Sequence, residues 1–309
     1  LEYIENPAKV SFPWSMIDKI TPRPDASVKK MLEDCGFTDT ESIVTTKNTY
    51  VAPFVNAEEA QYLVIENAFP NGRPALENAG VMFTSRETVE KVERMKVCTC
   101  LNPLHTALAV YGCLLGYTKI SDEMKDADLV KLVEIIGYKE GLPVVTDPGI
   151  LSPKKFIDEV LQIRVPNPFM PDTPQRIACD TSQKLSIRFG ETIKEYMASS
   201  ELDVKSLKFI PMVQAGWCRY LLGVDDELNA FTVSPDPMYE ELAGKLAGVK
   251  VGESCDVHAV LSPILSDAKI FGVNLYEAGL GEYVESIFAE LIAGKGAVRE
   301  TLKKHLAEA

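Results

Sequence analysis

The sequence predicts a mainly α-helical protein with a small mixed α/β portion at its N-terminal end. Up to about residue 85, apolar residues alternate or cluster with β-branched residues, as in short strands. From Ser85 onward they recur at the three- and four-residue intervals of helices. The 46% hydrophobic and 25% charged residues are ordinary for a globular protein. We therefore expect two domains, residues 1–90 and residues 91–309, the second of them helical.

The first 90 residues contain the signals of three strands and one helix. Strands are expected over residues 42–51, 62–66 and 80–85, which are β-branched or alternating. A short helix over residues 27–35 should stop at Gly36. An Asn-Gly pair in residues 69–74 predicts a turn before the third strand.

Helix signals then follow one another to the C-terminus. Ser85 is placed to cap a helix over residues 86–95, and Asn102 to cap a helix whose first residue is Pro103. Ser-Pro at 152–153 and Thr-Pro at 173–174 begin two more helices, and residues 207–222, 238–247 and 257–271 continue the series. Apolar stripes at helical spacing comprise Leu104, Leu108, Tyr111 and Leu115; Phe156, Val160 and Ile163; and Val284, Ile287, Phe288, Leu291 and Ile292.

Charge and cysteine content limit the partners and the compartment. The net charge of −13 argues against a general nucleic-acid binder, which needs a basic surface. No uninterrupted apolar run approaches about 20 residues, so no membrane span is expected. The seven cysteines form no C-x-x-C pair, and no signal peptide follows Leu1, so we expect a reduced, cytoplasmic protein. The sequence does not indicate an oligomeric state.

Familiar cofactor and nucleophile motifs are missing from the sequence. It has no G-x-G-x-x-G after a strand, no phosphate-binding loop of the Walker type and no G-x-S-x-G elbow. It also has no H-E-x-x-H and no clustered Cys/His set, so we expect no metal site. Any chemistry must come from isolated polar side chains in a helical setting.

Such side chains occur together in one apolar stretch, "MKVCTCLNPLHTALAVYG". Asn102 and His105 are three residues apart and share a helix face that continues through small and apolar residues. A lysine folded against such a face loses hydration, which favours its neutral form and lets it exchange a proton near neutral pH. An amide beside it can donate to a carbonyl oxygen that gains charge. Lys96, Asn102 and His105 could thus interconvert a secondary alcohol and a ketone without a metal.

Each of these residues also has a plain structural explanation. Asn102 could simply cap the helix that begins at Pro103, Lys96 could be a solvated residue at a helix end, and His105 could be a half-buried core histidine. Arg176, Asp180 and Lys184, spaced four residues apart, could form an ordinary surface ladder of charges. The residues alone leave these alternatives open.

Several segments together resemble the mannitol dehydrogenase family, the polyol-specific long-chain dehydrogenases. The resemblance covers almost the whole chain. Its segments are "SFPWSMIDKITP" at 11–22, "VIENAFPNGRP" at 64–74, "KVCTCLNPLHTALAVYGCLLGY" at 96–117, "CDTSQKLSIRF" at 179–189 and "GLGEYVESIFAELIAGKGAVRETL" at 279–302.

The resemblance implies a role for each candidate residue. Lys96 would be the general base for alcohol oxidation and the general acid for ketone reduction. Asn102 would stabilise the substrate oxygen, and His105 would orient the substrate. Arg176 and Lys184 would contact substrate as the two later cations of the family.

The resemblance also implies a fold and a cofactor. The helical portion should resemble the C-terminal domain of 6-phosphogluconate dehydrogenase-like enzymes. Residues 1–90 would be the remnant of an N-terminal Rossmann-type domain that binds NAD. On this expectation the chain lacks a nucleotide-binding portion on the order of 150–200 residues. The chain alone would then be inactive, and we assign no cofactor-binding residue.

Three positions depart from the family pattern. Five residues separate Lys96 from Asn102, one more than in the family, and one extra helical residue turns a side chain by about 100°. Lys96 can therefore act with Asn102 only if the segment between them is irregular or contains a bulge. Trp14 stands where the family commonly has an asparagine that binds the substrate oxygen, and Asn67 stands where it often has an aspartate. We expect Trp14 and Asn67 to be substrate-binding positions, and Trp14 to mark a distinct substrate branch.

The leading hypothesis is the substrate-binding and catalytic half of an NAD-dependent oxidoreductase acting on a small sugar acid or polyol. The branch that it most resembles interconverts fructuronate and mannonate. Arg176, with Lys184 second, would then hold the substrate carboxylate. Alternatives within the family are the branches that act on mannitol or tagaturonate. An alternative of another class is a helical interaction module without chemistry.

Overall fold

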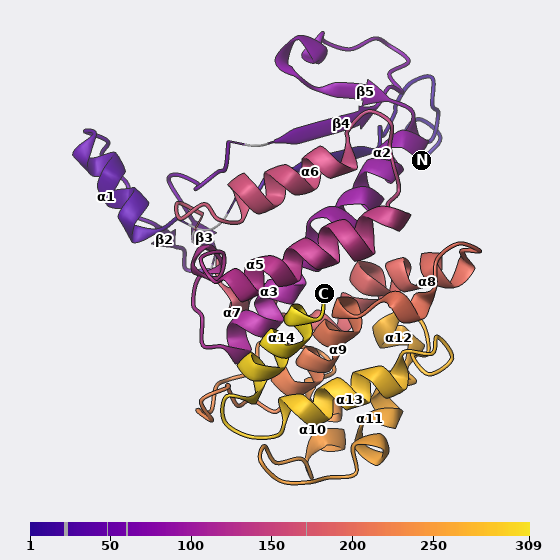
Figure 1. The fold of residues 1–309 in the computed structure, drawn as a ribbon. Helices are drawn as coiled ribbons and strands as arrows, with labels where there is room; N and C mark the ends of the chain where they lie inside the picture. Colours follow the sequence, from indigo (N-terminus) through magenta and orange to yellow (C-terminus); the bar gives the residue numbers. More distant parts are fainter. Residues whose placement is uncertain (22–23, 48, 60, 171) are drawn as a thin grey trace. The chain divides into compact units, whose positions relative to one another are not determined.

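The computed structural model describes residues 1–21, 24–47, 49–59, 61–170 and 172–309, which Figure 1 colours along the chain. The chain divides into two compact units. Unit 1 comprises residues 1–94, 147–152 and 167–171, and unit 2 comprises the remaining residues.

Unit 1 is built on a three-stranded sheet with the strand order β1-β4-β5. Strand β4 pairs antiparallel with β1 and parallel with β5. Helix α2 packs on β1 and β4 and buries Val89 and Val92 against Met16 and Val64. The main elements of unit 1 are β1 (Ser15–Asp18), α1 (Ala26–Asp34), β4 (Tyr62–Glu66), the 3₁₀ helix η1 (Leu76–Ala79), β5 (Met82–Thr84) and α2 (Arg86–Arg94). The predictions of strands at 62–66 and 80–85 and of helices at 27–35 and 86–95 are confirmed within one or two residues.

The strand predicted over residues 42–51 is wrong. In its place lie two short antiparallel strands, β2 (Ile43–Val44) and β3 (Tyr50–Val51). The chain reverses between them around Thr45, whose hydroxyl accepts from the backbone N–H groups of Lys47 and Thr49 at 3.3 and 3.1 Å. A threonine side chain that bonds nearby backbone in this way offers the chain a turn in place of a continuing strand. Asn48, inside the predicted strand, lies outside the described residues.

Unit 2 is helical, in agreement with the mainly α-helical fold class that the sequence predicts, and helix α3 (Asn102–Leu114) lies at its centre. From Pro103 to Leu114 every residue of α3 is buried. It packs against α7 and α9, and also against α4 and α5. The α-helices of unit 2 are α3, α4 (Ile120–Glu123), α5 (Ala127–Glu134), α6 (Pro153–Glu159), α7 (Pro174–Ile177), α8 (Glu191–Ala198), α9 (Phe209–Tyr220), α10 (Tyr239–Leu246), α11 (Val257–Leu265), α12 (Ala268–Phe271), α13 (Gly281–Leu291) and α14 (Ala297–Ala307). Three short 3₁₀ helices connect them: η4 (Leu142–Val144), η6 (Thr181–Gln183) and η8 (Val204–Ser206).

Unit 2 also contains π-helical turns, in which the backbone bonds span five residues in place of four. Those that the structure describes are η2 (Met95–Cys100), η3 (Ile135–Gly141), η5 (Val160–Arg164) and η7 (Ser186–Gly190). The π-turn η5 changes one predicted stripe. Phe156 and Val160 are buried as predicted, but Ile163 is 63% exposed and Arg164 is buried instead. The wider turn shifts the buried position by one residue, which an α-helical spacing does not anticipate.

The helix predicted over residues 257–271 is two helices, α11 and α12. They are separated at Ser266 and Asp267, and the Asp267 carboxylate accepts from the N–H of Lys269 at 2.8 Å as the cap of α12. The stripe predicted for the C-terminal region is confirmed, because its five members are all buried in or directly after α13.

One helical stretch, Arg86–Leu114, is long and apolar enough to span a membrane by length and composition. Most of it is buried inside the protein, and a core helix passes the same test. The stretch is thus weak evidence for a membrane span, and the absence of a membrane partner stays a prediction.

Candidate functional site

The π-turn η2 carries Lys96 and runs directly into α3. The N–H of Leu101 donates to the carbonyl oxygen of Lys96 at 3.1 Å, a bond across five residues. This turn accommodates one residue more than an α-helical turn, which matches the extra residue between Lys96 and Asn102. The segment is therefore irregular in the way that a shared site for these two residues requires. Lys96 itself is half-buried.

Asn102 is the first residue of α3 and does not cap it, so the predicted cap is wrong. The cap position belongs to Leu101, which makes no side-chain hydrogen bond there. Leu101 separates η2 from α3 with non-helical dihedral angles, but its N–H donates to the Lys96 carbonyl oxygen at 3.1 Å and its carbonyl oxygen accepts from the His105 N–H at 3.0 Å. The Asn102 carbonyl oxygen accepts from the Thr106 hydroxyl at 2.9 Å. The capping role therefore no longer explains Asn102.

His105 lies one turn further along α3 and is buried, at 9% exposure. Burial lowers its pKa to about 4, against an opposing effect of the Asp172 carboxylate. The positive charges of Arg188, Arg176 and Arg164 lower the pKa further. The imidazole is therefore neutral at neutral pH, with one nitrogen that donates and one that accepts.

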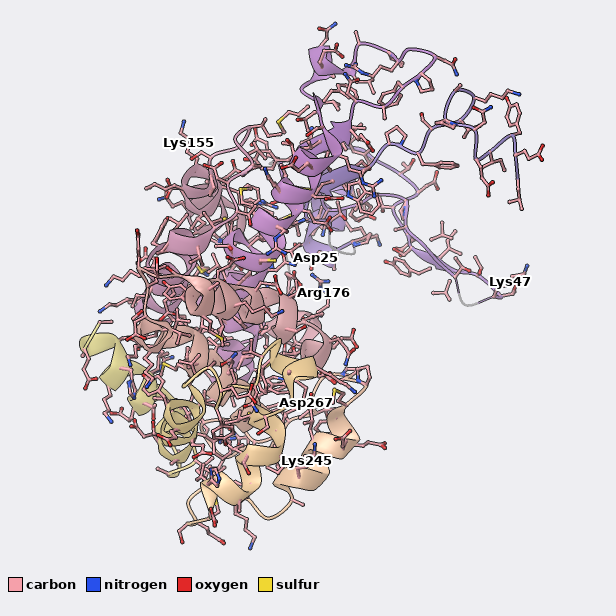
Figure 2. All side chains as sticks on the ribbon, turned by 90° about the vertical axis from the view of Figure 1, so that its right-hand side faces the viewer. Asp25, Lys47, Lys155, Arg176, Lys245 and Asp267 are labelled. Carbon is pink, nitrogen blue, oxygen red and sulfur yellow. The ribbon has the colours of Figure 1, made fainter. Side chains whose placement is uncertain are left out.

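Arg176 lies on the short helix α7, which Thr173 caps by accepting the Arg176 backbone N–H at 3.2 Å. Its guanidinium forms a two-pronged pair with the buried Asp172, in which Nε donates to Oδ1 at 2.6 Å and Nη2 donates to Oδ2. This pairing raises the pKa of Arg176, and the side chain, labelled in Figure 2, remains 61% exposed. The alternative of a surface ladder is wrong, since α7 ends at Ile177 and Asp180 has a left-handed backbone with φ of 52°.

Lys184 follows that irregular segment, and its ammonium donates to the carbonyl oxygen of Cys179. Its pKa is lowered, first by burial and then by the charge of Arg188, with a smaller effect of Arg176. The same two guanidinium groups also lower the pKa of His105. The structure thus brings His105, Arg176 and Lys184 into one electrostatic neighbourhood.

Arg188 belongs to this neighbourhood and was not among the sequence candidates. It is half-buried in η7, which packs against η2 and α3, and its Nη1 donates to the Thr106 hydroxyl at 2.6 Å. Burial lowers the pKa of Arg188 to about 10. Its sequence signal was the four-residue spacing of charges, which begins at Asp172 and continues past Lys184 to Arg188.

Trp14 and Asn67 belong to unit 1. The Trp14 backbone N–H donates to the Glu66 carboxylate at 3.0 Å, and the Arg86 guanidinium lies 4.7 Å from the centre of its ring. The Asn67 side-chain oxygen accepts from Nε of Arg73 at 3.0 Å. Their role in binding substrate stays a prediction.

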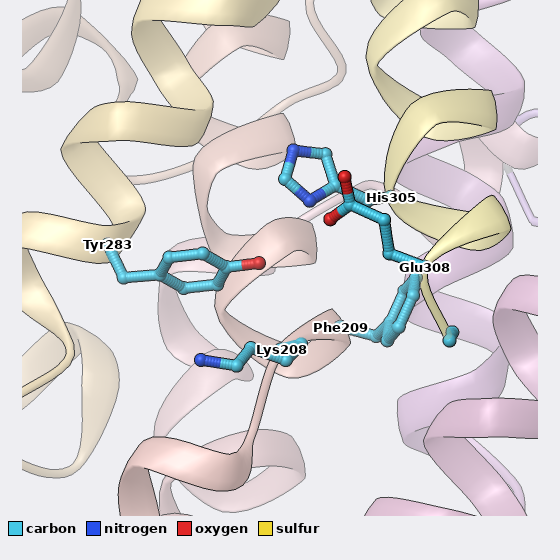
Figure 3. Close-up of a pocket in the computed structure, with 6 residues that line it drawn as sticks. Lys208, Phe209, Tyr283, His305 and Glu308 are labelled. Carbon is cyan, nitrogen blue, oxygen red and sulfur yellow. The ribbon is translucent and has the colours of Figure 1, made fainter.

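A pocket of about 300 Å³ lies elsewhere in unit 2 and contains none of the predicted residues. Figure 3 shows its lining, with the Lys208 ammonium 4.7 Å from the centre of the Tyr283 ring. His305 lies edge-on to Tyr283 at 6.4 Å and faces the Glu290 carboxylate at 3.2 Å. Lys208, Tyr283 and His305 of this pocket therefore contact one another or the neighbouring Glu290. Among the described residues, no group of three His, Cys, Asp or Glu is placed to hold a metal ion, and metal independence stays a prediction.

Comparison with known proteins identifies the class to which this helical unit belongs. Residues 88–287 match the model of the mannitol dehydrogenase C-terminal domain, about two thirds of the chain. The chain therefore belongs to the mannitol dehydrogenase family. This confirms the resemblance and, with the structure, the mainly α-helical fold class.

Individual relatives show how much of a longer protein the chain matches. It is 59% identical to D-mannonate oxidoreductase of Thermotoga maritima, over 98% of this chain and 56% of the relative. It is 31% identical to mannitol 2-dehydrogenase of Aspergillus niger, over 85% of this chain and 51% of the relative. A solved ternary complex of Pseudomonas fluorescens mannitol 2-dehydrogenase with NAD and D-mannitol matches with a TM-score of 0.75 and 26% identity, over 100% of this chain and 56% of that chain. The chain thus spans about half the length of the relatives that it matches.

Proposed function

We propose that the chain is the substrate-binding and catalytic part of an NAD-dependent oxidoreductase that interconverts a sugar acid and its keto form, with D-mannonate and fructuronate as the best candidates. The observation that carries the proposal is the cationic neighbourhood of the neutral His105, beside a π-turn that accommodates the extra residue between Lys96 and Asn102. The relative with 59% identity is named a D-mannonate oxidoreductase, which supports the choice of an acidic substrate.

The described residues fit the substrate side of such a reaction. A neutral imidazole can donate to one sugar hydroxyl and accept from another, and the cations around it suit an anionic substrate. When bound, NAD supplies the acceptor for the hydride that leaves the carbinol carbon. We assign no residue of this chain to the dinucleotide.

In this proposal each candidate residue has one task. During oxidation Lys96 Nζ takes the proton from the substrate hydroxyl, and during reduction it returns the proton to the same oxygen. The Asn102 amide donates to that oxygen while it carries the most negative charge. His105 orients the substrate, and Arg176 and Lys184 contact the remaining oxygen atoms of the substrate. Trp14 and Asn67 are proposed as further substrate contacts.

A polyol such as D-mannitol is the second candidate substrate. The solved relative that matches all of this chain holds D-mannitol and NAD. Tagaturonate remains the alternative acidic substrate. A helical interaction module without chemistry loses support, because it explains neither the buried histidine among cations nor the family match.

A substrate panel with the natural full-length protein tests the proposal. D-mannonate, D-altronate and D-mannitol would each be supplied with NAD, and NADH formation would be followed by absorbance. We expect the highest kcat/KM with D-mannonate. A preference for D-mannitol would support the polyol alternative, and no turnover of any of the three would refute the dehydrogenase assignment.

A further inference from the structure

Arg188 is a partly desolvated cation with very little to neutralise it. Its one hydrogen bond to the described residues goes to an uncharged group, the Thr106 hydroxyl. No carboxylate in the described parts of the chain lies within ion-pair distance of its guanidinium, and burial alone accounts for its lowered pKa. Taking a charge partly out of water without a charged partner is costly, so such a group is a candidate to bind an anionic ligand.

Other arginines of unit 2 are satisfied by the protein itself. Arg176 has the two oxygens of Asp172, and Arg299 pairs with both Asp126 and Asp128. Because the Nε and Nη2 atoms of Arg176 are already taken, Arg176 is less available to grip a second carboxylate. This changes the order suggested by the sequence, in which Arg176 came first and Lys184 second.

The surroundings of Arg188 are those of the proposed active site. Its π-turn η7 packs against η2, which carries Lys96, and against α3, which carries Asn102 and His105. Its partner Thr106 is the residue directly after His105. The charge of Arg188 is also felt at both Lys184 and His105.

We propose that Arg188 binds the carboxylate of the substrate and thereby selects a sugar acid over the corresponding polyol. The inference rests on the proposed function, because it assumes that the site around His105 receives the substrate. A guanidinium offers two parallel N–H groups to a carboxylate, an arrangement that a polyol's terminal hydroxyl cannot match.

The test compares D-mannonate with D-mannitol, which differ only in a carboxylate and a CH₂OH group at one end of the same carbon chain. The Arg188→Met variant of the full-length protein should lose about tenfold to hundredfold in kcat/KM for D-mannonate, the worth of one charge-assisted contact. Its kcat/KM for D-mannitol should change by less than about threefold. Arg188→Lys should keep part of the preference, since it retains the charge but not the two-pronged geometry.

Thr106→Val is the matched control, because it removes the hydrogen bond to Arg188 but leaves the cation. It also removes the bond to the Asn102 carbonyl oxygen, an effect that both substrates share, so the ratio of the two kcat/KM values is the readout. It should preserve the preference for D-mannonate over D-mannitol. If Thr106→Val and Arg188→Met behave alike, or if Arg188→Met weakens both substrates equally, Arg188 is only a structural tie and the inference is overturned. Wild-type turnover of D-mannitol without D-mannonate would overturn the inference but leave a dehydrogenase. No wild-type turnover at all would overturn the proposed function as well.

Discussion

Two arginines of unit 2 have similarly lowered pKa values but different hydrogen-bond partners. Burial lowers the pKa of both Arg188 and Arg219 to about 10. Arg219, in α9, donates to the carbonyl oxygens of Leu291, Val224 and Asp225 at 3.2, 2.6 and 3.2 Å. Arg188 donates to one hydroxyl. A low pKa therefore does not mark a functional residue by itself, and the count of satisfied donors distinguishes a residue that builds the fold from one that is open to a ligand.

The same contrast holds for the regions around the two arginines. The region around α9 contains charges matched by backbone groups, such as Glu140, whose carboxylate accepts from the N–H groups of Lys208, Phe209 and Ile210 at 2.6 to 2.8 Å. Its unpaired groups are uncharged: the Gln214 amide and Trp217 Nε1 of α9 have no hydrogen-bond partner among the described residues. In the region around η7 and the start of α3, the charge of Arg188 has no carboxylate partner among the described residues. The first region should therefore respond to mutation through stability, and the second through activity.

The largest effect is expected from Lys96→Met in the full-length protein. Loss of the proposed acid and base should lower kcat by about a hundredfold to ten-thousandfold, the usual contribution of proton transfer. The loss should be similar for D-mannonate and D-mannitol, because both lose a hydroxyl proton. Steady-state kinetics and thermal unfolding would be measured together. A large fall in Tm with kcat nearly intact would mean that Lys96 stabilises the fold and does not take part in the reaction.

A smaller effect, and one on stability alone, is expected from Arg219→Met. The variant leaves one buried and two partly buried carbonyl oxygens without this donor, which should lower the free energy of unfolding by about 3 kcal/mol. Urea unfolding measures this change directly. Arg188→Met should lower stability by less than about 1 kcal/mol, because it removes a single hydrogen bond and also an unpaired cation. Equal losses in the two variants would break the comparison between the arginines.

The sequence located the helices that carry the candidate residues better than it indicated the tertiary contacts of those residues. Helix periodicity and capping signals located α2, α3, α9 and α13, since burial on one face leaves a local pattern. Of the π-turns, only η2 was anticipated, through the extra residue between Lys96 and Asn102 relative to the family spacing. The others could not be predicted, because one additional residue per turn leaves no signal in composition. The π-turn η5 displaced Ile163 to the surface. After η2, Leu101 takes the cap position that was predicted for Asn102. The pairing of Arg176 with Asp172 and the isolation of Arg188 depend on tertiary contacts, so only the regular spacing of the charges was visible in advance.

Glu123 tests the comparison between Arg188 and Arg219 most sharply, because it is a buried polar group that can become neutral by taking up a proton. It is fully buried, and neither carboxylate oxygen has a hydrogen-bond partner among the described residues. Burial, with a smaller effect of Asp126, raises its pKa from 4.5 to about 9. An unpaired guanidinium cannot shed its proton at neutral pH and needs an anion, whereas an unpaired carboxyl can take up a proton. We therefore assign a ligand to Arg188 and none to Glu123.

The pH dependence of stability follows from that shift. Between pH 4.5 and about 9 the folded state binds the Glu123 proton and the unfolded state does not. The contribution of Glu123 to stability is therefore fully present below the lower value and is lost as the pH rises, at about 1.4 kcal/mol per pH unit. In Glu123→Gln this contribution is absent, so the difference in unfolding free energy between wild type and variant should change by about 2 kcal/mol from pH 5.5 to pH 7.

Urea unfolding at a series of pH values measures this slope, and a constant cost of the buried amide does not alter it. Asp122→Asn is the control, because the side chain of this neighbouring residue is 44% exposed and pairs with Lys125 at 2.6 Å. Equal slopes in wild type and Glu123→Gln would mean that Glu123 has a partner in solution. The missing partners of a side chain would then be no basis for assigning a ligand to Arg188 and none to Arg219.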